Sequence, residues 1–182
     1  MSVRANPTSV VITGATGAIG GALAERYAAP GVRLTLHGRK LDVLTALAAR
    51  CEAAGAQVLV QAGDVRDRDS YRAWLTALCL AEAPDLVLLT AGLNTHVGPD
   101  GELEDWASVE ALLDVNVWAV MATVDAVLPA MRRRGAGQIA LFSSLAAYHG
   151  LALTPSYSAS KAAIKAYGEA LRGLLAPSGI AV

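Results

Sequence analysis

The sequence predicts an α/β fold in which a doubly wound parallel sheet lies between two layers of helices. Short runs rich in Val, Ile and Leu alternate with longer amphipathic stretches rich in Ala. A glycine-rich turn follows the first run, and no repeat, low-complexity linker or block of charge divides the chain. Because crossovers between parallel strands are right-handed, this alternation predicts the three-layer α/β/α arrangement called Rossmann-type.

The expected elements alternate as strand and helix along the whole chain. Strands are expected at residues 10–13, 32–37, 57–61, 85–90 and 138–143, where the runs are short and apolar. Helices are expected at residues 18–29, 41–53, 68–81, 106–133 and 156–176, and each is long enough to cross over the sheet. Pro177 and Gly179 predict a turn, after which Ile180 to Val182 indicate the opening of another strand.

Length and composition favour one domain. The chain has 182 residues, of which 54% are hydrophobic, and this is enough for one sizeable core. We therefore expect a single domain over residues 1–182. Because three residues make a very short last strand, we also expect the chain to be incomplete at its carboxyl end; a natural stop at Val182 is the alternative.

Charge and cysteine content argue against several classes of protein. The formal net charge is -1, and the one basic run, Arg132 to Arg134, precedes Gly135 and fits the end of a helix, so we expect neither nucleic acid nor an anionic membrane as a partner. Met1 to Ser9 lacks the apolar core of a secretory signal, and no apolar run approaches membrane-spanning length. Cys51 and Cys79 lack the close spacing of a metal or redox motif, so we expect no metal site and a soluble cytoplasmic protein.

A glycine-rich turn, Thr13-Gly14-Ala15-Thr16-Gly17-Ala18-Ile19-Gly20, follows the first expected strand and opens the first expected helix. This is the context that a dinucleotide fingerprint requires. Glycine allows a tight turn and a close approach of the backbone to a pyrophosphate, whose charge then faces free N–H groups at the helix end. We expect a dinucleotide here; a purely structural turn is the alternative. The expected cofactor contacts in this turn are Gly14, Thr16, Gly17, Ile19 and Gly20.

The end of the second expected strand indicates which dinucleotide is bound. A carboxylate at this place would hydrogen-bond the adenosine ribose and repel a 2'-phosphate. The chain instead has His37-Gly38-Arg39-Lys40. Arg39, with Lys40 beside it, could hold a 2'-phosphate through charge-assisted hydrogen bonds, so NADP(H) is expected in preference to NAD(H). The alternative is that both cations only begin a solvated helix.

Tyr157 and Lys161 lie four residues apart on the last expected helix, and therefore on one face of it. Thr154 and Pro155 suit the N-cap and first position, which puts Tyr157 in the first turn, at the positive end of the helix dipole. A phenol with a pKa near ~10 is a poor base, and lowering this pKa to about 7 requires roughly 4 kcal/mol. An ammonium ~4.5 Å away supplies about 3.7 kcal/mol at an effective dielectric of ~20. With smaller help from the helix dipole and an oxidised nicotinamide, Lys161 therefore makes Tyr157 a usable acid or base.

In this order and spacing, these motifs resemble the short-chain dehydrogenase/reductase family over nearly the whole chain. The family's turn also begins Thr-Gly and ends in Gly six residues after the first. The middle glycine, Gly17, fits the longer branch that modifies sugar nucleotides. The interval of thirteen residues from Ser144 to Tyr157 matches the single-domain branch instead, and we give it more weight.

The resemblance implies a role for each residue at the reacting centre. The hydroxyl of Ser144, which we expect to end the fifth strand, would hydrogen-bond the substrate oxygen; its neighbour Ser143 is the alternative. Tyr157 would transfer the proton, and Lys161 would also hold the nicotinamide ribose. Asn116 would interrupt the long helix and hold a water that links Lys161 to solvent. A plain core asparagine is the alternative.

Two further segments take cofactor contacts from the resemblance. Asp64 and Val65, after the third strand, would contact the adenine ring; a helix N-cap is the alternative for Asp64. Ala91 and Gly92, after the fourth strand, would allow close approach of the cofactor. Here the chain has Leu-Thr-Ala-Gly where the family commonly has Asn-Asn-Ala-Gly, which puts the stiffening of the sheet in doubt.

The function implied is reversible, NADP(H)-dependent transfer of a hydride between nicotinamide and a small ketone or secondary alcohol, with Tyr157 as general acid or base. Relatives pair their long helices between subunits, so a homodimer or homotetramer is expected. They also continue into two further strands and a lid that shapes the substrate pocket. One alternative is a sugar-nucleotide epimerase or dehydratase; another is a non-catalytic NADP(H)-binding sensor or scaffold. His96 and His149 lie in loops near the expected substrate and receive no role.

Overall fold

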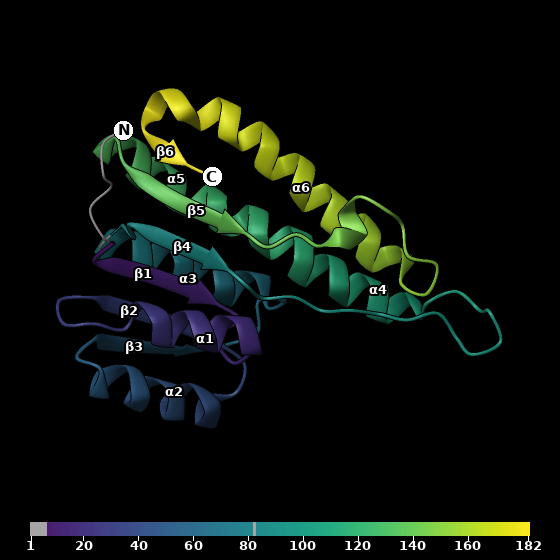
Figure 1. Ribbon diagram of the computed structural model, residues 1–182, viewed down its shortest axis with the longest axis horizontal. Helices are drawn as coiled ribbons and strands as arrows, with labels where there is room; N and C mark the ends of the chain where they lie inside the picture. The colour runs from purple at the N-terminus through teal and green to yellow at the C-terminus, as the bar shows by residue number, and fades with distance from the viewer. Residues whose placement is uncertain (1–6, 82) are drawn as a thin grey trace.

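The computed structural model describes residues 7–81 and 83–182, which form one parallel sheet with helices on both faces (Figure 1). The strands lie in the order β3-β2-β1-β4-β5-β6. This order runs outward in both directions from β1 and β4, so the chain switches sides between these two strands. The strands are β1 (Ser9–Thr13), β2 (Arg33–Gly38), β3 (Gln57–Ala62), β4 (Leu86–Leu89), β5 (Gly137–Leu141) and β6 (Ile180–Ala181). The predicted Rossmann-type fold is confirmed.

Alternate residues of the central strands point to two separate cores. Val10 and Ile12 of β1 face a cluster that includes Leu44 and Leu47, whereas Val11 faces a cluster with residues of the two longest helices. Both faces of the strands are thus buried, which explains their unbroken apolar sequence. The helices are α1 (Ala18–Tyr27) and α2 (Leu41–Ala53) on one face, with α3 (Arg68–Ala81), α4 (Trp106–Leu113), α5 (Ala119–Arg134) and α6 (Pro155–Leu175) on the other.

The predicted elements are all present, and most of their bounds differ from the expected ones by one or two residues. The fifth strand ends at Leu141 and not at Ser143, because its partner β4 ends at Leu89, which pairs with Leu141. The sixth strand is as short as expected, yet its two residues pair with β5. Gly179 precedes it with φ of 72°, and a Cβ there would lie 2.3 Å from the Gly135 carbonyl oxygen, so this turn requires glycine.

One long helix corrects an expectation from the sequence. α4 continues through a π-helical turn (Asp114–Trp118) into α5, and the whole helix spans Trp106–Arg134. By length and composition it could cross a membrane, so the expectation that no apolar run approaches that length is wrong. Half of its most apolar window is buried inside the protein. It therefore has the properties of a core helix.

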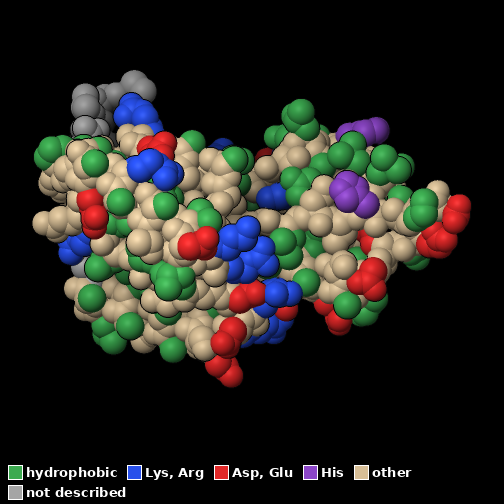
Figure 2. Space-filling model, turned by 90° about the horizontal axis from the view of Figure 1, so that it is seen from below, with side chains coloured by type: hydrophobic (Ala, Val, Ile, Leu, Met, Phe, Trp, Pro, Cys, Tyr) green, Lys and Arg blue, Asp and Glu red, His purple; other side chains and the backbone are tan. Residues whose placement is uncertain are grey.

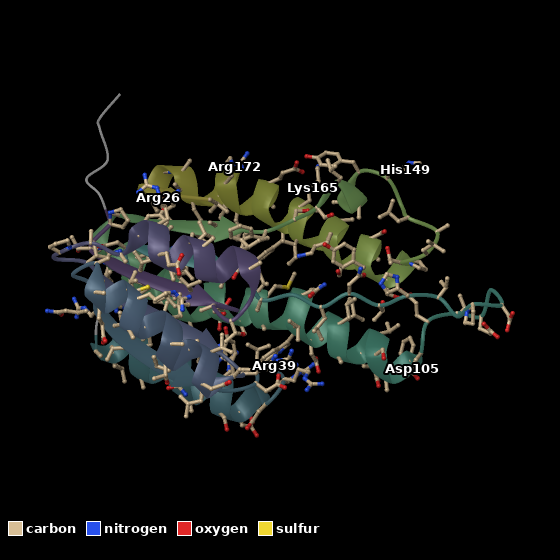
Figure 3. The ribbon with its side chains drawn as sticks, turned by 60° about the horizontal axis from the view of Figure 1, so that its bottom comes forward. Arg26, Arg39, Asp105, His149, Lys165 and Arg172 are labelled. Carbon is tan, nitrogen blue, oxygen red and sulfur yellow. The ribbon has the colours of Figure 1, made fainter. Side chains whose placement is uncertain are left out.

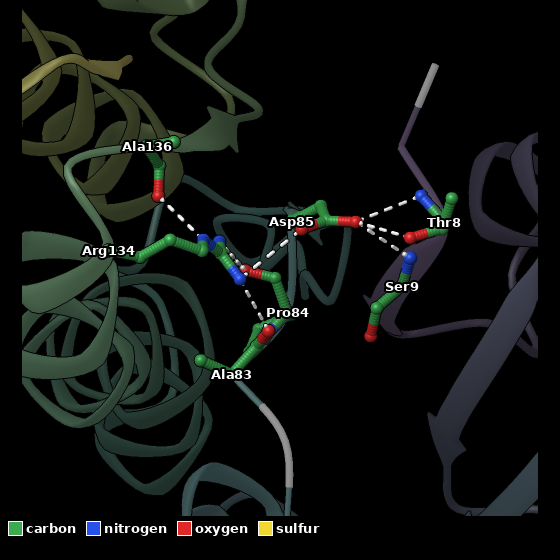
Figure 4. Close-up of polar contacts among 7 residues, drawn as sticks. All are labelled: Thr8, Ser9, Ala83, Pro84, Asp85, Arg134 and Ala136. Carbon is green, nitrogen blue, oxygen red and sulfur yellow. Dashed lines mark hydrogen bonds and ion pairs between the residues drawn. The ribbon is translucent and has the colours of Figure 1, made fainter. Parts of the chain in front are cut away.

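The basic run at the end of α5 closes the helix, as predicted, and it also contacts the sheet at the amino-terminal ends of its strands. α5 ends at Arg134, and Gly135 follows with φ of 68°. The Arg134 guanidinium donates to the carbonyl oxygens of Ala83 (2.8 Å) and Pro84 (2.7 Å) and pairs with the Asp85 carboxylate at 3.2 Å (Figure 4). The C-terminus of α5 is thereby tied to the segment that leads into β4.

Asp85 extends this network to the first strand. Its second carboxylate oxygen accepts hydrogen bonds from the Thr8 amide and hydroxyl, both at 2.9 Å, and from the Ser9 amide at 3.1 Å (Figure 4). Partial burial works against ionisation, but the hydrogen bonds from Thr8 and Ser9 and the charge of Arg134 lower the pKa of Asp85. One ion pair thus joins the starts of β1 and β4 to the end of α5.

Replacing this arginine should destabilise the fold. Arg134→Ala leaves partly buried carbonyl groups without a donor and is expected to lower the free energy of unfolding by about 1–2 kcal/mol. Urea denaturation of the variant measures the loss. Arg133→Ala is the matched control, because Arg133 is exposed in the same turn. Equal losses in both variants would contradict the role of the network.

Candidate active site

The carboxyl ends of β1, β2 and β4 open into a cavity of about 250 Å³ at the switch point of the sheet. On the face shown in Figure 2, basic side chains gather near the middle, beside a depression in the surface, with acidic side chains among them and others on the projecting edge. Most of the predicted cofactor contacts line this cavity: Gly14, Thr16, Gly17, Arg39, Asp64, Val65, Ala91 and Gly92.

The glycine turn is shaped by close packing against the fourth strand. Gly14 has φ of 72°, and a Cβ on it would lie 2.5 Å from the Ala91 amide nitrogen. A Cβ on Gly20 would lie 2.5 Å from the Gly14 carbonyl oxygen, so Gly20 packs directly against the turn. Gly20 does not line the cavity. Gly17 is the N-cap of α1, without a side-chain cap, and Ile19 is 57% exposed outside the cavity. Free N–H groups of α1 are therefore available at the turn.

Thr90 replaces one of the amides that the family motif contains. Its hydroxyl donates to the Thr13 carbonyl oxygen at 2.6 Å, and its backbone N–H donates to the same oxygen at 3.2 Å. This bridge joins β1 and β4 just beyond their last paired residues. The stiffening that the sequence put in doubt is thus supplied by a hydroxyl, which the sequence analysis missed.

Thr16 and Gly38 meet at the end of the cavity where β2 ends. A Cβ on Gly38 would lie 2.8 Å from the Thr16 methyl group, so a carboxylate side chain at this position would collide with Thr16. Arg39 and Lys40 are exposed at the rim of the cavity. Arg39 lies at the lower edge of the α1–α2 layer in Figure 3, and Arg26 lies toward the other end of α1. The only charged side chains that the end of β2 offers here are cations.

Asp64 is held by its neighbour Arg66. The Arg66 guanidinium donates to the Asp64 carboxylate at 2.7 Å, and the Arg66 backbone N–H donates to it at 3.0 Å. The hydrogen bond from the Arg66 side chain lowers the pKa of Asp64. The alternative of a helix N-cap is wrong, because α3 begins at Arg68 and the Ser70 amide donates to Asp67. Asp64 instead holds a turn at the edge of the cavity.

His37 is a second residue that sequence reasoning missed. Its side chain is 3% exposed, lines the cavity and packs against the rings of Tyr71 and Trp74, with centroids 5.3 and 4.7 Å away. Among the described residues, its Nδ1 has no hydrogen-bond partner. Burial lowers the pKa of His37 to about 4, against the opposing charge of Asp64. The imidazole is thus neutral at pH 7. A polar residue inside the apolar run of β2 was the available signal.

Lys161 lies between two of the predicted site residues, Tyr157 and Gly92. It is 7% exposed, and its Nζ donates to the Phe142 carbonyl oxygen at 2.8 Å. The same Nζ is 5.6 Å from the centroid of the Tyr157 ring and 3.8 Å from the position of a Cβ on Gly92. Burial lowers the pKa of Lys161. The fold therefore brings Tyr157, Lys161 and Gly92 together.

Asn116 occupies the middle of the π-helical turn, where the sequence predicted an interruption of the helix. Its side chain is buried; Oδ1 accepts from the Leu93 amide at 2.8 Å, and Nδ2 donates to the Leu93 carbonyl at 2.9 Å and to Ser160 Oγ at 3.0 Å. Ser160 Oγ in turn donates to the Tyr157 carbonyl oxygen at 2.8 Å. Asn116 thus ties the loop after β4 to the first turns of α6.

Ser144 lies three residues past β5 and not at its end. Its Oγ accepts from the Ala146 amide at 3.2 Å and caps the 3-10 helix Leu145–Ala147. The hydroxyl of the neighbouring Ser143 donates to the Lys161 carbonyl oxygen at 2.9 Å. Ser143 is therefore engaged with α6, whereas the hydroxyl hydrogen of Ser144 has no acceptor among the described residues.

The Rossmann-type sheet and the glycine-lined cavity at its switch point define a dinucleotide-binding protein. The family model described as short chain dehydrogenase matches residues 8–182, and the chain belongs to that family. It is thus an oxidoreductase that acts on alcohol or carbonyl groups. The resemblance inferred from the motifs is confirmed.

Known relatives agree with this assignment. An uncharacterized oxidoreductase of Myxococcus xanthus is 37% identical over 174 residues, which are 96% of this chain and 68% of the relative. A metagenomic short-chain oxidoreductase in complex with NADP is 29% identical with a TM-score of 0.88, over 95% of this chain and 78% of that one. An NAD+-bound xylitol dehydrogenase is 25% identical with a TM-score of 0.86, over 95% and 66% of the two chains.

The buried imidazole predicts a dependence of stability on pH. The unfolded chain binds a proton on His37 near pH 6.5 and the folded chain only near pH 4, so stability is lost as the pH falls through this window. From pH 7 to pH 4.5 the loss through this group is about 2 kcal/mol. Urea denaturation of His37→Gln at both pH values should show a loss smaller by this amount than in the wild type. His149→Gln, at an exposed loop position, is the control, and an unchanged loss in His37→Gln would contradict the burial of a neutral imidazole.

Proposed function

We propose that this chain is an NADP(H)-dependent oxidoreductase that interconverts a ketone and a secondary alcohol. Residues 1–182 would form a single domain that both binds the cofactor and carries the catalytic residues. The observation that supports this most directly is the position of the Lys161 ammonium, 5.6 Å from the Tyr157 ring centroid and next to Gly92 of the cavity. A buried cation between a phenol and the glycine-lined cavity matches what acid–base chemistry beside a nicotinamide requires.

The cavity fits a dinucleotide. Close packing at Gly14 lets the backbone after β1 approach a pyrophosphate, and the uncapped start of α1 at Gly17 offers N–H groups to its charge. Ala91 and Gly92 leave space where the nicotinamide half would lie. When bound, this cofactor supplies or accepts the hydride at the substrate carbon.

The residues around the substrate oxygen move and hold the proton. In reduction, the Tyr157 hydroxyl gives its proton to the carbonyl oxygen; in oxidation, the phenolate takes the proton from the alcohol. Lys161 stabilises the phenolate and holds the nicotinamide ribose, and the hydroxyl of Ser144 donates to the substrate oxygen. Asn116 keeps α6 in register and lies on the path by which a water links Lys161 to solvent.

The preference for NADP(H) rests on the end of β2. A Cβ on Gly38 would lie 2.8 Å from the Thr16 methyl group, which disfavours a carboxylate side chain there, and Arg39 and Lys40 stand at the rim. Both features favour a 2'-phosphate over a free hydroxyl. Asp64 and Val65 line the adenine side of the same cavity.

The rival functions are less well supported. An epimerase or dehydratase of sugar nucleotides matches the position of Gly17, but the interval of thirteen residues from Ser144 to Tyr157 matches the single-domain branch instead. A sensor or scaffold leaves the buried Lys161 unexplained.

We place the protein in the cytoplasm as a homodimer or homotetramer. Met121 of α5 and Leu174 of α6 are exposed hydrophobic side chains. Their exposure supports pairing of the long helices between two subunits.

The phenol is the first target for a test. Tyr157→Phe keeps the ring and removes the proton donor, so ketone-dependent oxidation of NADPH should fall by a factor of at least ~10³ while the Kd for NADPH changes by no more than a few fold. Turnover by absorbance and binding by nicotinamide fluorescence measure the two effects. Tyr148→Phe removes a hydroxyl from an exposed ring and should match the wild type. Undiminished turnover in Tyr157→Phe would sink the acid–base role.

The cofactor preference has its own test. Arg39→Ala removes a cation that would meet the 2'-phosphate, so the Kd for NADPH should rise about tenfold or more and the Kd for NADH should rise much less. Fluorescence titration with each cofactor gives both constants. Arg26→Ala changes the same charge at the other end of α1 and should alter neither. Equal losses for NADPH and NADH in Arg39→Ala would argue against recognition of the 2'-phosphate.

A further inference from the structure

Glu104, in the loop between β4 and α4, binds the start of the helix that carries Tyr157. Its carboxylate accepts the Ser156 backbone N–H at 3.0 Å and the Ser156 hydroxyl. Its other oxygen accepts the Thr95 hydroxyl at 2.6 Å. Although partial burial opposes it, the hydrogen bonds from Ser156 and Thr95 lower the pKa of Glu104. A carboxylate more than fifty residues away in sequence therefore occupies the first turn of α6.

Thr154, the N-cap residue of α6, does not use its side chain to cap the helix. Thr154 stands at the N-cap with Pro155 after it, as predicted, but the Thr154 side chain makes no capping hydrogen bond. Its hydroxyl is buried and has no partner among the described residues. An N-cap side chain normally accepts an N–H of the first turn. Here Glu104 accepts the N–H of Ser156, which directly precedes Tyr157, and so takes over the function of the cap.

The next residue in the chain caps a second helix. The Asp105 carboxylate accepts from the Ser108 amide at 2.9 Å and from the Ser108 hydroxyl at 2.8 Å, which closes the start of α4. Figure 3 places Asp105 at this helix end. α4 runs on into the turn that holds Asn116. Two consecutive carboxylates thus join the beginnings of the helices that bear Asn116 and Tyr157.

A backbone hydrogen bond supports the same junction. The Val97 amide donates to the Leu153 carbonyl oxygen at 3.1 Å, so the loops after β4 and β5 meet beside Glu104. Further along, Asn116 and Ser160 connect α6 to the turn after β4. α6 is therefore held from one side at two levels, and Glu104 is the contact nearest to the Tyr157 backbone.

We propose that Glu104 is a positioning residue, which caps α6 from the loop after β4 and thereby fixes the Tyr157 ring beside Lys161. The hydrogen bonds of the cap are read from the structure, and their importance for catalysis rests on the proposed function. In this role the residue acts through the helix, and it does not line the cavity at the switch point.

Three variants separate this role from general effects. Glu104→Ala removes the acceptor. Glu104→Gln keeps it, because the amide oxygen can accept from Ser156 while the amide nitrogen donates to the Thr95 hydroxyl. Glu102→Gln is the matched control, since it removes the same charge two residues away, where the carboxylate accepts the Asp100 amide and not an amide of α6.

NMR provides two readouts that need no turnover. In Glu104→Ala, exchange of the Ser156 amide with solvent should quicken roughly tenfold, while the amide of Ile164 in the middle of α6 keeps its rate. The Tyr157 ring resonances, assigned by their absence in Tyr157→Phe, should shift or broaden. Both properties should return to wild-type values in Glu104→Gln and stay there in Glu102→Gln.

Each other result overturns the proposal. Unchanged Tyr157 ring resonances in Glu104→Ala would show that the cap does not position the ring. Equal acceleration at Ser156 and Ile164, or a Glu104→Gln variant that behaves as Glu104→Ala, would show that Glu104 only stabilises the fold or acts through its charge. A wild-type protein that transfers no hydride would overturn the proposed function alone, because these readouts do not depend on it.

Discussion

The ammonium group of Lys161 is buried beyond the end of the sheet, at the centre of the site. A buried charge needs hydrogen-bond acceptors and a fixed position. Lys161 is 7% exposed and donates to one carbonyl oxygen, that of Phe142. Burial of a charge with so few partners is costly, and the lowered pKa of Lys161 expresses this cost. The ammonium stays in place because α6 is anchored around it. Ser143 binds the Lys161 carbonyl, and Ser160 joins the same helix to Asn116.

The fixed position of α6 also depends on close packing at the switch point of the sheet. Gly14 and Gly20 let the first turn approach Ala91 and Thr90 without side chains between them. Thr90 then bonds to Thr13 through its hydroxyl, so β1 and β4 stay together beyond their last pair. A looser junction would let the loop after β4 move, and Leu93 of that loop is what Asn116 holds. The cavity at the switch point and the position of α6 thus depend on one set of contacts.

The sequence predicts the parts of this site that depend on local pattern. Apolar runs locate the strands, and the turn at Gly14 and the pair Tyr157 and Lys161 lie on the expected elements because their spacing is short. Contacts between distant segments are not visible in this way. Glu104 and Ser156 are separated in the sequence by α4, α5 and β5, and His37 is buried by Trp74 of a later helix. The end of β5 depends on the length of β4, which is why Ser144 lies beyond the strand.

Glu104 also changes the electrostatic argument for the phenol. From sequence, the positive end of the α6 dipole and Lys161 both favour a phenolate at Tyr157. In the structure, the Ser156 N–H at that end already donates to a carboxylate, whose negative charge opposes the dipole within the first turn. The dipole is therefore partly offset at this end of the helix, and the Lys161 ammonium lies over the Tyr157 ring, 5.6 Å from its centroid. The position of the ring relative to Lys161 then matters more than the position of Tyr157 on the helix.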